Sequence, residues 1–334
     1  MLIQARTPTR IDLAGGTLDI PPLYLFEEGG ITLNISITVH SEVTVELQDT
    51  GVDLVSRDTG ASLHADSYDS LPMDGDLDLV ARIVRFYRPG NGVRVETHCA
   101  APKGSGLGAS SSLLIALSGA LNRAGGDRYT KDDMIRIGAN LEAQCIGIPT
   151  GKQDYYGAMF GGVKAIWFEV DGDRVEPLIV DEAVLDDLES RLVLTFTGES
   201  HFSGSTNWSM FSGYINGSPG VRQAMREIKA TALGMRNALR EGDLRSFAGL
   251  LDHEWEHRKA LADGVSTAQI ERMVTAARGA GALASKICGA GGGGCMITLA
   301  DHGNRSAVAK ALEDAGAQVV PYRIDREGLV IEIR

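Results

Sequence analysis

One stretch of the sequence constrains the fold more than any other, residues 102–112, which read PKGSGLGASSS. Three glycines and three consecutive serines stand directly before an apolar stretch whose large residues recur at helical spacing, from Leu113 to Leu121. A loop of small residues that runs into a helix gathers free backbone N–H groups at the positive end of the helix dipole, which favours a phosphate. The same pattern is typical of a flexible turn before a helix, and this stretch alone leaves both interpretations open.

Two other kinds of glycine-rich loop fit this stretch poorly. A P-loop requires Lys followed by Ser or Thr after its last glycine, whereas Gly108 is followed by Ala109 and Ser110. A dinucleotide-binding loop requires GxGxxG, whereas Gly104, Gly106 and Gly108 give GxGxG, with no strand and acidic residue at the usual distance. The loop therefore belongs to neither class.

The composition excludes several kinds of protein. The formal net charge of −12, without any basic run, argues against a nucleic-acid partner. No apolar run reaches the length of about 18 residues that a membrane helix needs, and the N-terminus lacks the apolar region of a secretory signal. The four cysteines have neither CxxC nor metal-site spacing, so we expect reduced thiols in a cytoplasmic protein. The sequence leaves monomer and homodimer open.

The order of the expected elements indicates an α+β chain. Residues 41–48 and the C-terminal GLVIEIR predict strands, and so does RLVLTF at 191–196. Helices are predicted after residue 112, after Thr130, from Val221 to Gly242, and from Asp243 to about Ala262, while residues 198–220 read as a polar loop. Strands and helices alternate irregularly, and 334 residues are enough for two cores, so we expect two lobes, residues 1–175 and 176–334.

Two more glycine-rich stretches accompany the first, RTPTRIDLAGGTLDIP at residues 6–21 and KICGAGGGGCMI at residues 286–297. In this order and at these separations, the three stretches resemble the motifs of the GHMP kinase superfamily, and the resemblance covers nearly the whole chain. It implies a two-lobed fold, with a ribosomal-S5-like N-terminal lobe, a ferredoxin-like C-terminal lobe and ATP bound in the cleft.

The resemblance also implies which residues hold the nucleotide and its Mg²⁺ ion. The residues implied around the ATP phosphates are Pro102, Gly104, Ser105, Gly106, Leu107, Gly108, Ala109, Ser110 and Ser111. Ser110 and Glu142 match the two metal ligands of the family. The alternative for Glu142 is a solvated helical glutamate, although it directly follows Leu141 of the predicted apolar stripe.

The segment TGKQDYYGAMFGG resembles the one that carries the catalytic aspartate of the family, which here is Asp154. An aspartate can orient an attacking hydroxyl and accept its proton as charge develops. Arg10 matches a basic residue of the family, and we expect it to pair with Asp154 and to lower the pKa of that carboxyl. Lys152 is expected to point away from Asp154 in an extended segment, with a lesser role.

Within the superfamily, two segments resemble the D-glycero-D-manno-heptose 7-phosphate kinases, RTPTRIDLAGGTLDIPPLY near the N-terminus and GKQDYYGAMFGG around Asp154. One departure is Leu18, which separates Thr17 from Asp19 where that branch has them adjacent. The resemblance implies transfer of the ATP γ-phosphoryl group to the anomeric hydroxyl of a sugar that carries a phosphate at its far end. The residues expected to contact the sugar are Gly16, Thr17, Asp19, Arg258 and Gly291.

Other functions compete with this one. The chain could be a kinase of a neutral sugar, as galactokinase is, or of mevalonate. From another class, it could be an inactive relative that binds nucleotide or sugar. The joint presence of Arg10, Ser110, Glu142 and Asp154 argues against an inactive relative.

One helix carries two further signals. Residues 253–257 read HEWEH, which fits the HExxH pattern of zinc proteases, but we interpret His253 and His257 as a solvated helix face. Arg258 falls on the apolar stripe of the same helix, so it must be paired or face a cleft. Pairing with Glu254 and contact with the phosphate of the sugar both remain open.

Overall fold

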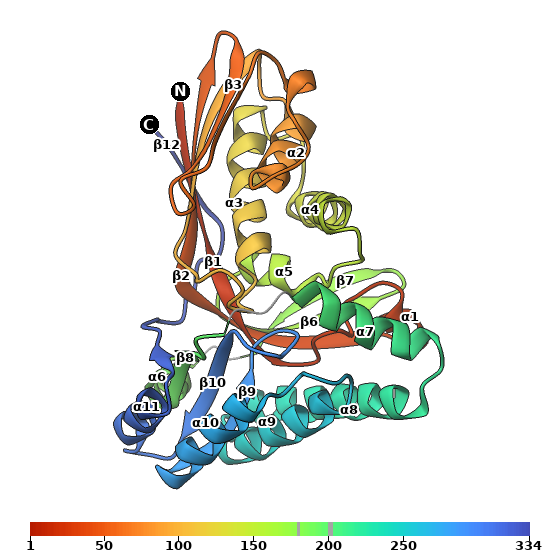
Figure 1. Cartoon of the computed structure of the whole chain (residues 1–334), viewed down its shortest axis with the longest axis vertical. Coiled ribbons are helices and arrows are strands. Elements are labelled where there is room, and N and C mark those ends of the chain that lie inside the picture. Colours follow the sequence, from red (N-terminus) through yellow and green to blue (C-terminus); the bar gives the residue numbers. More distant parts are fainter. Residues whose placement is uncertain (179–180, 200–202) are drawn as a thin grey trace.

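The structure, a computed structural model, describes residues 1–178, 181–199 and 203–334 and has two lobes (Figure 1). Within these residues the N-terminal lobe has an eight-stranded sheet with β6 and β7 branching from β2, and the C-terminal lobe has a four-stranded sheet in the order β11-β8-β10-β9. The larger sheet contains β1 (Leu2–Ala14), β2 (Gly30–Gln48), β3 (Gly51–Ser56), β4 (Ser62–Ala65), β5 (Gly92–Cys99), β6 (Val163–Glu169), β7 (Gly172–Pro177) and β12 (Val330–Ile333). The smaller sheet contains β8 (Leu192–Phe196), β9 (Ala282–Ile287), β10 (Cys295–Ala300) and β11 (Gln318–Val319).

Helices cover these sheets, and α2 to α5 lie on one face of the larger sheet (Figure 1). The helices of the N-terminal lobe are α1 (Leu23–Phe26), α2 (Asp78–Tyr87), α3 (Ala109–Ala124), α4 (Lys131–Ile146) and α5 (Gln153–Met159), with a short 3₁₀ turn at Tyr68–Ser70. Those of the C-terminal lobe are α6 (Glu182–Arg191), α7 (Ser203–Ile215), α8 (Pro219–Glu241), α9 (Leu244–Lys259), α10 (Ala268–Gly279) and α11 (Arg305–Asp314). None of the helices described here is long and apolar enough to cross a membrane. The two-lobed α+β fold is confirmed.

Several helix ends lie where the sequence predicts them. Thr130 caps α4 by accepting the backbone N–H of Asp133, whose side chain accepts the N–H of Thr130 in return. Gly242 ends α8 with φ at 70°, and Asp243 then caps α9 through its side chain. These caps satisfy backbone groups that a helix end would otherwise leave without partners.

The prediction of a loop over residues 198–220 was wrong, because α7 occupies residues 203–215. Its buried residues Thr206, Met210 and Tyr214 recur every four positions and therefore share one helix face. Met210 and Tyr214 join an apolar cluster that includes Leu18 and Met225. Burial of this face stabilises a helix whose many Gly and Ser residues have low helix propensity. Residues 200–202 of the predicted loop lie outside the described residues.

The chain ends in the lobe where it began. β12 pairs antiparallel with β1, so the last strand lies across the expected boundary near residue 175. An apolar cluster also spans both lobes and packs Ile11 and Leu33 of the large sheet with Phe247 and Leu251 of α9. The lobes are therefore joined by a shared core as well as by the chain, which fixes the walls of the cleft between them.

Candidate active site

Residues from all three glycine-rich stretches line one cleft. Loops that are far apart in the sequence meet here because β1 enters it from the N-terminal lobe and the loop between β9 and β10 enters it from the other lobe. The residues of the three stretches in its wall are Arg10, Gly16, Thr17, Asp19, Ile20, Gly104, Ser105, Gly106, Gly108, Ala109, Ser110, Ser111, Gly289 and Ala290. Glu142, Asp154 and Arg258 line the same cleft. Most of the residues expected at the site are thus brought together.

Three expected residues lie outside that wall, namely Pro102, Leu107 and Gly291. Leu107 is fully buried, and its carbonyl accepts a 3.0 Å hydrogen bond from the backbone N–H of Arg10. Gly291 faces Val265, since a Cβ atom on it would lie 2.7 Å from the Val265 carbonyl oxygen. These residues shape the loops of the cleft from behind.

The middle glycine loop is held between two neighbours that leave no space for side chains. Gly106 and Gly108 both have φ at 71°, a conformation that favours glycine. A Cβ on Gly106 would lie 2.5 Å from the carbonyl oxygen of Cys288, and one on Gly108 would lie 3.0 Å from the carboxyl of Asp154. The loop therefore packs against residues 286–297 on one side and the segment that carries Asp154 on the other.

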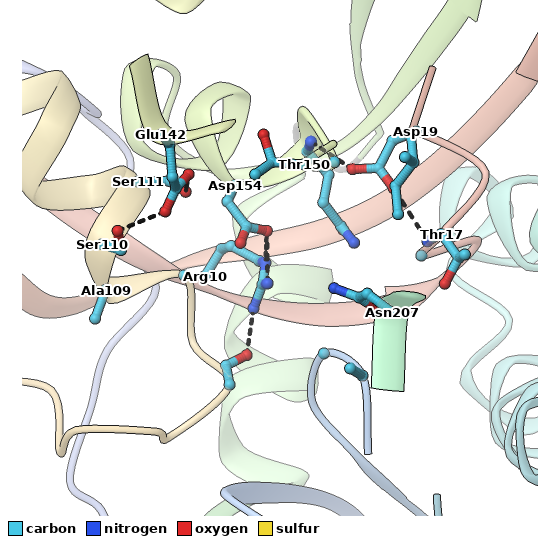
Figure 2. A pocket seen from close by; sticks show the side chains of 18 of the residues that line it. Arg10, Thr17, Asp19, Ala109, Ser110, Ser111, Glu142, Thr150, Asp154 and Asn207 are labelled. Carbon is cyan, nitrogen blue, oxygen red and sulfur yellow. Dashed lines mark hydrogen bonds and ion pairs between the residues drawn. The ribbon is translucent and has the colours of Figure 1, made fainter. Parts of the chain in front are cut away.

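Arg10 and Asp154 form an ion pair at the centre of the cleft (Figure 2). Nε of Arg10 donates to Oδ1 of Asp154 at 2.6 Å, and Nη1 donates to the carbonyl of Gly106 at 2.6 Å. The pairing is confirmed, and Arg10 does act to lower the pKa of Asp154, but the net direction differs from the expected one. Burial raises the pKa of Asp154, and the attraction of Arg10 opposes that rise only in part.

Glu142 lies on one side of this pair and is surrounded by hydroxyl groups (Figure 2). Ser110, Ser111 and Tyr155 all donate to its carboxylate, and Ser111 does so at 3.2 Å. Burial raises the pKa of Glu142, while the hydrogen bonds from Ser110 and Tyr155 lower it. None of the ion pairs between described residues involves Glu142. Its carboxylate and the Ser110 hydroxyl are oxygen ligands of the kind that Mg²⁺ prefers, so these residues fit a magnesium ion.

Asp19 lies on the other side of the Arg10–Asp154 pair in the same view (Figure 2). Its carboxylate accepts the backbone N–H of Thr17 at 3.0 Å and that of Gln153 at 2.8 Å. Burial raises the pKa of Asp19 to about 6, although the Gln153 N–H opposes the rise. The Thr17 hydroxyl donates to the sulfur of Met210 at 3.6 Å. Asp19 therefore presents a fixed, only weakly acidic carboxyl to the cleft.

Arg258 both pairs with Glu254 and lines the cleft. Its Nε and Nη2 atoms donate to Oε1 of Glu254 at 2.8 and 2.5 Å, and Nη2 also donates to the carbonyl of Gly16 at 3.1 Å. Lys286 extends this group, since its Nζ lies 3.0 Å from Oδ2 of Asp12 and 3.1 Å from Oε2 of Glu254. Two carboxylates and two cations thus form a buried, charge-balanced network behind the glycine-rich stretch of residues 6–21.

The HEWEH segment forms no zinc site in the described part of the chain. His253 is exposed, and Glu254 points inward to Arg258 and Lys286. Among all the residues that the structure describes, no group of three or more His, Cys, Asp and Glu side chains could hold a metal ion.

The segment around Asp154 is a helix, α5, and not the extended segment that we expected from the sequence. Lys152 precedes this helix and pairs with Asp173 at 2.5 Å, with its ammonium also over the ring of Phe168. Among the residues of the cleft wall that sequence analysis missed, three carry polar side chains, Thr150, Gln153 and Asn207. The four-residue recurrence of Thr206, Met210 and Tyr214 in α7 is the signal that could have placed Asn207.

One cleft between the lobes thus holds a loop of small residues at a helix N-terminus, an Arg–Asp pair and a glutamate surrounded by hydroxyl groups. This combination is typical of an enzyme that transfers a phosphoryl group to a small molecule. Family comparison agrees. Residues 78–162 match the model described as GHMP kinases N terminal domain, and residues 235–318 match GHMP kinases C terminal. The chain belongs to the GHMP kinase family and is an ATP-dependent kinase.

Individual relatives cover the chain almost completely. It is 30% identical to the D-glycero-alpha-D-manno-heptose 7-phosphate kinase of Campylobacter jejuni, over 98% of each chain. A solved D-glycero-D-manno-heptose 1-phosphate kinase from Bacteroides thetaiotaomicron is 27% identical, with a TM-score of 0.80 over 99% of each chain. The L-fucokinase/L-fucose-1-P guanylyltransferase of Bacteroides fragilis is 28% identical over 90% of this chain, which corresponds to 34% of that longer protein.

Proposed function

We propose that the chain transfers the γ-phosphoryl group of ATP to the anomeric hydroxyl of D-glycero-D-manno-heptose 7-phosphate. The observation that carries this proposal is the end-to-end similarity to a heptose 7-phosphate kinase, at 30% identity over 98% of both chains. The cleft supplies what such a reaction needs, because one aspartate lies between a phosphate-binding loop and a second, sugar-facing carboxyl.

Asp154 acts as the base in this proposal. The anomeric hydroxyl donates a hydrogen bond to its carboxylate and gives up its proton as the oxygen attacks the γ-phosphorus. The bond from that phosphorus to the bridging oxygen of ADP breaks, and ADP leaves with the electron pair. The raised pKa of Asp154 makes it a better proton acceptor than an ordinary aspartate.

Arg10 orients that base. Its guanidinium joins Asp154 to the Gly106 carbonyl, so the aspartate and the phosphate loop are held at a fixed separation. In-line phosphoryl transfer depends on such placement more than on covalent help from the protein. Because the side chain of Arg10 is only 4% exposed, its charge is also little screened by solvent.

Ser110 and Glu142 would hold the Mg²⁺ ion that accompanies ATP. The ion would neutralise part of the charge on the phosphates. The backbone N–H groups at the start of α3, together with the helix dipole, provide the rest of the phosphate site.

A substrate panel tests the proposal. We expect kcat/KM to be highest for heptose 7-phosphate among this sugar phosphate, its unphosphorylated heptose, galactose, L-fucose and mevalonate. Equal or better turnover of galactose, L-fucose or mevalonate would contradict the assignment of the acceptor. Binding of ATP without turnover of any acceptor would favour the inactive relative.

A further inference from the structure

Lys164 is a charged residue that the proposed reaction does not use, although it lies directly beneath the catalytic helix. It stands on β6 opposite Asn34 of β2, and only 1% of it is exposed. Its Nζ atom donates to Oδ1 of Asn34 at 3.1 Å, to Oγ of Ser36 at 2.7 Å and to the carbonyl of Gly162 at 3.1 Å. An amino group donates hydrogen bonds whether or not it is protonated, and three acceptors surround it here.

The two side chains that Lys164 contacts, Asn34 and Ser36, also hydrogen-bond to the backbone of α5. Nδ2 of Asn34 donates to the carbonyl of Gln153 at 3.2 Å, at the start of the helix. The hydroxyl of Ser36 lies 2.6 Å from the carbonyl of Gly157 and 3.1 Å from that of Phe160, at its end. A single amino group is thus linked to both ends of the helix that carries Asp154.

The same surface also fixes Arg10. In the pairing of β1 with β2, Arg10 stands opposite Ser36. A Cβ added to Gly157 would lie 2.9 Å from the Cβ and Cγ atoms of Arg10, so α5 rests directly on the stem of that side chain. Any shift of α5 over β2 would therefore change the geometry between Arg10 and Asp154.

A buried amino group is costly, and the contacts of Lys164 are neutral oxygens within hydrogen-bond distance. The opposite charge that acts on Lys164 is that of Asp325, whose carboxylate is itself bonded to His40 at 2.8 Å. An apolar residue would fill the same space without that cost, but it would leave Asn34 and Ser36 free to turn away from the helix. The hydrogen bonds that hold α5 in place therefore offset the cost of burying the Lys164 amino group.

From this network we infer that Lys164 is a positioning residue that holds α5, through Asn34 and Ser36, so that Asp154 meets the acceptor hydroxyl in line. The inference deepens the proposed function and rests on it. It predicts an effect on the chemical step and not on ATP binding, because Lys164 touches neither the phosphate loop nor the cleft.

Steady-state kinetics of Lys164→Met and Ser36→Ala test this inference. We expect kcat to fall roughly ten- to a hundredfold in Lys164→Met, the cost of a small misplacement of a catalytic group, with KM for ATP unchanged. Ser36→Ala should cause a smaller fall of the same kind. Since the two act in one chain of contacts, the double variant should lose less than the product of the two single effects.

Ile166→Val is the matched control, because Ile166 is fully buried on the same strand and takes no part in the network. A kcat loss in Ile166→Val equal to that in Lys164→Met, or fully multiplicative effects of Lys164→Met and Ser36→Ala, would overturn the inference. If Lys164→Met does not fold, an unchanged kcat in Ser36→Ala would overturn it.

Deuterium uptake by the peptide covering residues 153–160 separates this inference from the proposed function. It should be faster in Lys164→Met and Ser36→Ala than in wild type or Ile166→Val, whatever the acceptor of the kinase is. Unchanged uptake would contradict the inference even in an active enzyme. An inactive wild type with the faster uptake in the variants would instead refute only the proposed substrate.

Discussion

Nε of Arg10 in strand β1 lies 2.6 Å from Oδ1 of Asp154 in helix α5, although the two residues are 144 positions apart in the sequence. The same guanidinium donates to the Gly106 carbonyl, so three segments of the chain converge on one charged group. The side chain of Arg10 is 4% exposed and that of Asp154 is 24% exposed, and loss of solvent still keeps the pKa of Asp154 raised beside its cationic neighbour. An aspartate of this kind is held in place and remains basic enough to take a proton.

Asp154→Asn removes the proton acceptor while preserving the size of the side chain. We expect kcat to fall by at least about 10²- to 10⁴-fold, the usual contribution of a general base, with the Kd for ATP unchanged. Single-turnover kinetics and ATP titration of the same preparation measure the two quantities. A kcat close to wild type would remove Asp154 from the mechanism.

Glu142→Gln and Ser110→Ala alter the residues that fit the magnesium ion. The half-saturating Mg²⁺ concentration should rise at least about tenfold in Glu142→Gln, since even indirect partners of a metal contribute that much to its affinity. Ser110→Ala should show the same change in weaker form. Titration of activity with Mg²⁺ at fixed ATP measures it, and identical midpoints in wild type and both variants would mean that the ion binds elsewhere.

The pKa of Asp19, raised to about 6, predicts a pH effect on the acceptor site. The ionised form accepts hydrogen bonds from sugar hydroxyls, and that form is lost as the pH falls below about 6. The KM for the sugar should therefore rise from pH 7 to pH 5 more steeply in wild type than in Asp19→Asn. Parallel pH profiles in the two proteins would show that Asp19 does not contact the sugar. The phosphate of the substrate also titrates in this pH range, but it does so equally with both proteins, so the difference between wild type and Asp19→Asn reports Asp19 alone.

Lys164 gives a second pH effect, this time on stability. Burial lowers the pKa of Lys164 to about 7 from an ordinary value near 10.5. At a pH between these two pKa values, Lys164 is protonated in the unfolded chain but not in the folded protein. The free energy of unfolding should therefore rise with pH, by up to about 1.4 kcal/mol per pH unit. Urea unfolding of wild type and Lys164→Met from pH 7 to pH 9 measures this. A difference between the two proteins that stays constant with pH would contradict the assigned environment of Lys164.

Arg258 is the residue whose role the sequence left open between structure and substrate. Its bonds to Glu254 and Gly16 predict that Arg258→Ala loses about 3–5 kcal/mol of stability, because Oε1 of the buried Glu254 loses both of its donors and Lys286 alone must balance two buried carboxylates. Glu254→Gln should mimic that loss. If Arg258 also holds the far phosphate of the sugar, Arg258→Ala alone should raise the KM for heptose 7-phosphate. Thermal melts and kinetics on both variants separate the two roles.

The motifs could be predicted from the sequence because glycine, serine and charged residues at fixed spacings carry a direct physical meaning. Arg10, Ser110, Glu142 and Asp154 were identified through the resemblance to the GHMP kinases that these motifs carry, and all four line one cleft. The direction of the Asp154 pKa could not be predicted, since it depends on how deeply α5 is buried. Helix α7 was missed because its Gly and Ser content conceals a buried face that becomes apparent only when Met210 and Tyr214 are packed.

The network around Lys164 could not be predicted from the sequence either. Asn34, Ser36 and Lys164 look like ordinary strand residues, and only the pairing of β2 with β6 brings them under α5. Likewise, the sequence marks Arg258 as a charge on an apolar stripe but does not show that Lys286 and Asp12 complete its network. Contacts between distant strands decide these roles.

The position of the new phosphate on the product tests the account most directly. Purified enzyme, ATP, Mg²⁺ and D-glycero-D-manno-heptose 7-phosphate would be followed by ³¹P NMR. We predict one ADP for each product molecule and a new phosphorus resonance split by the anomeric proton, both forming at least about a hundredfold more slowly with Asp154→Asn. A phosphate on any other carbon, or ADP accompanied only by inorganic phosphate, would contradict the account.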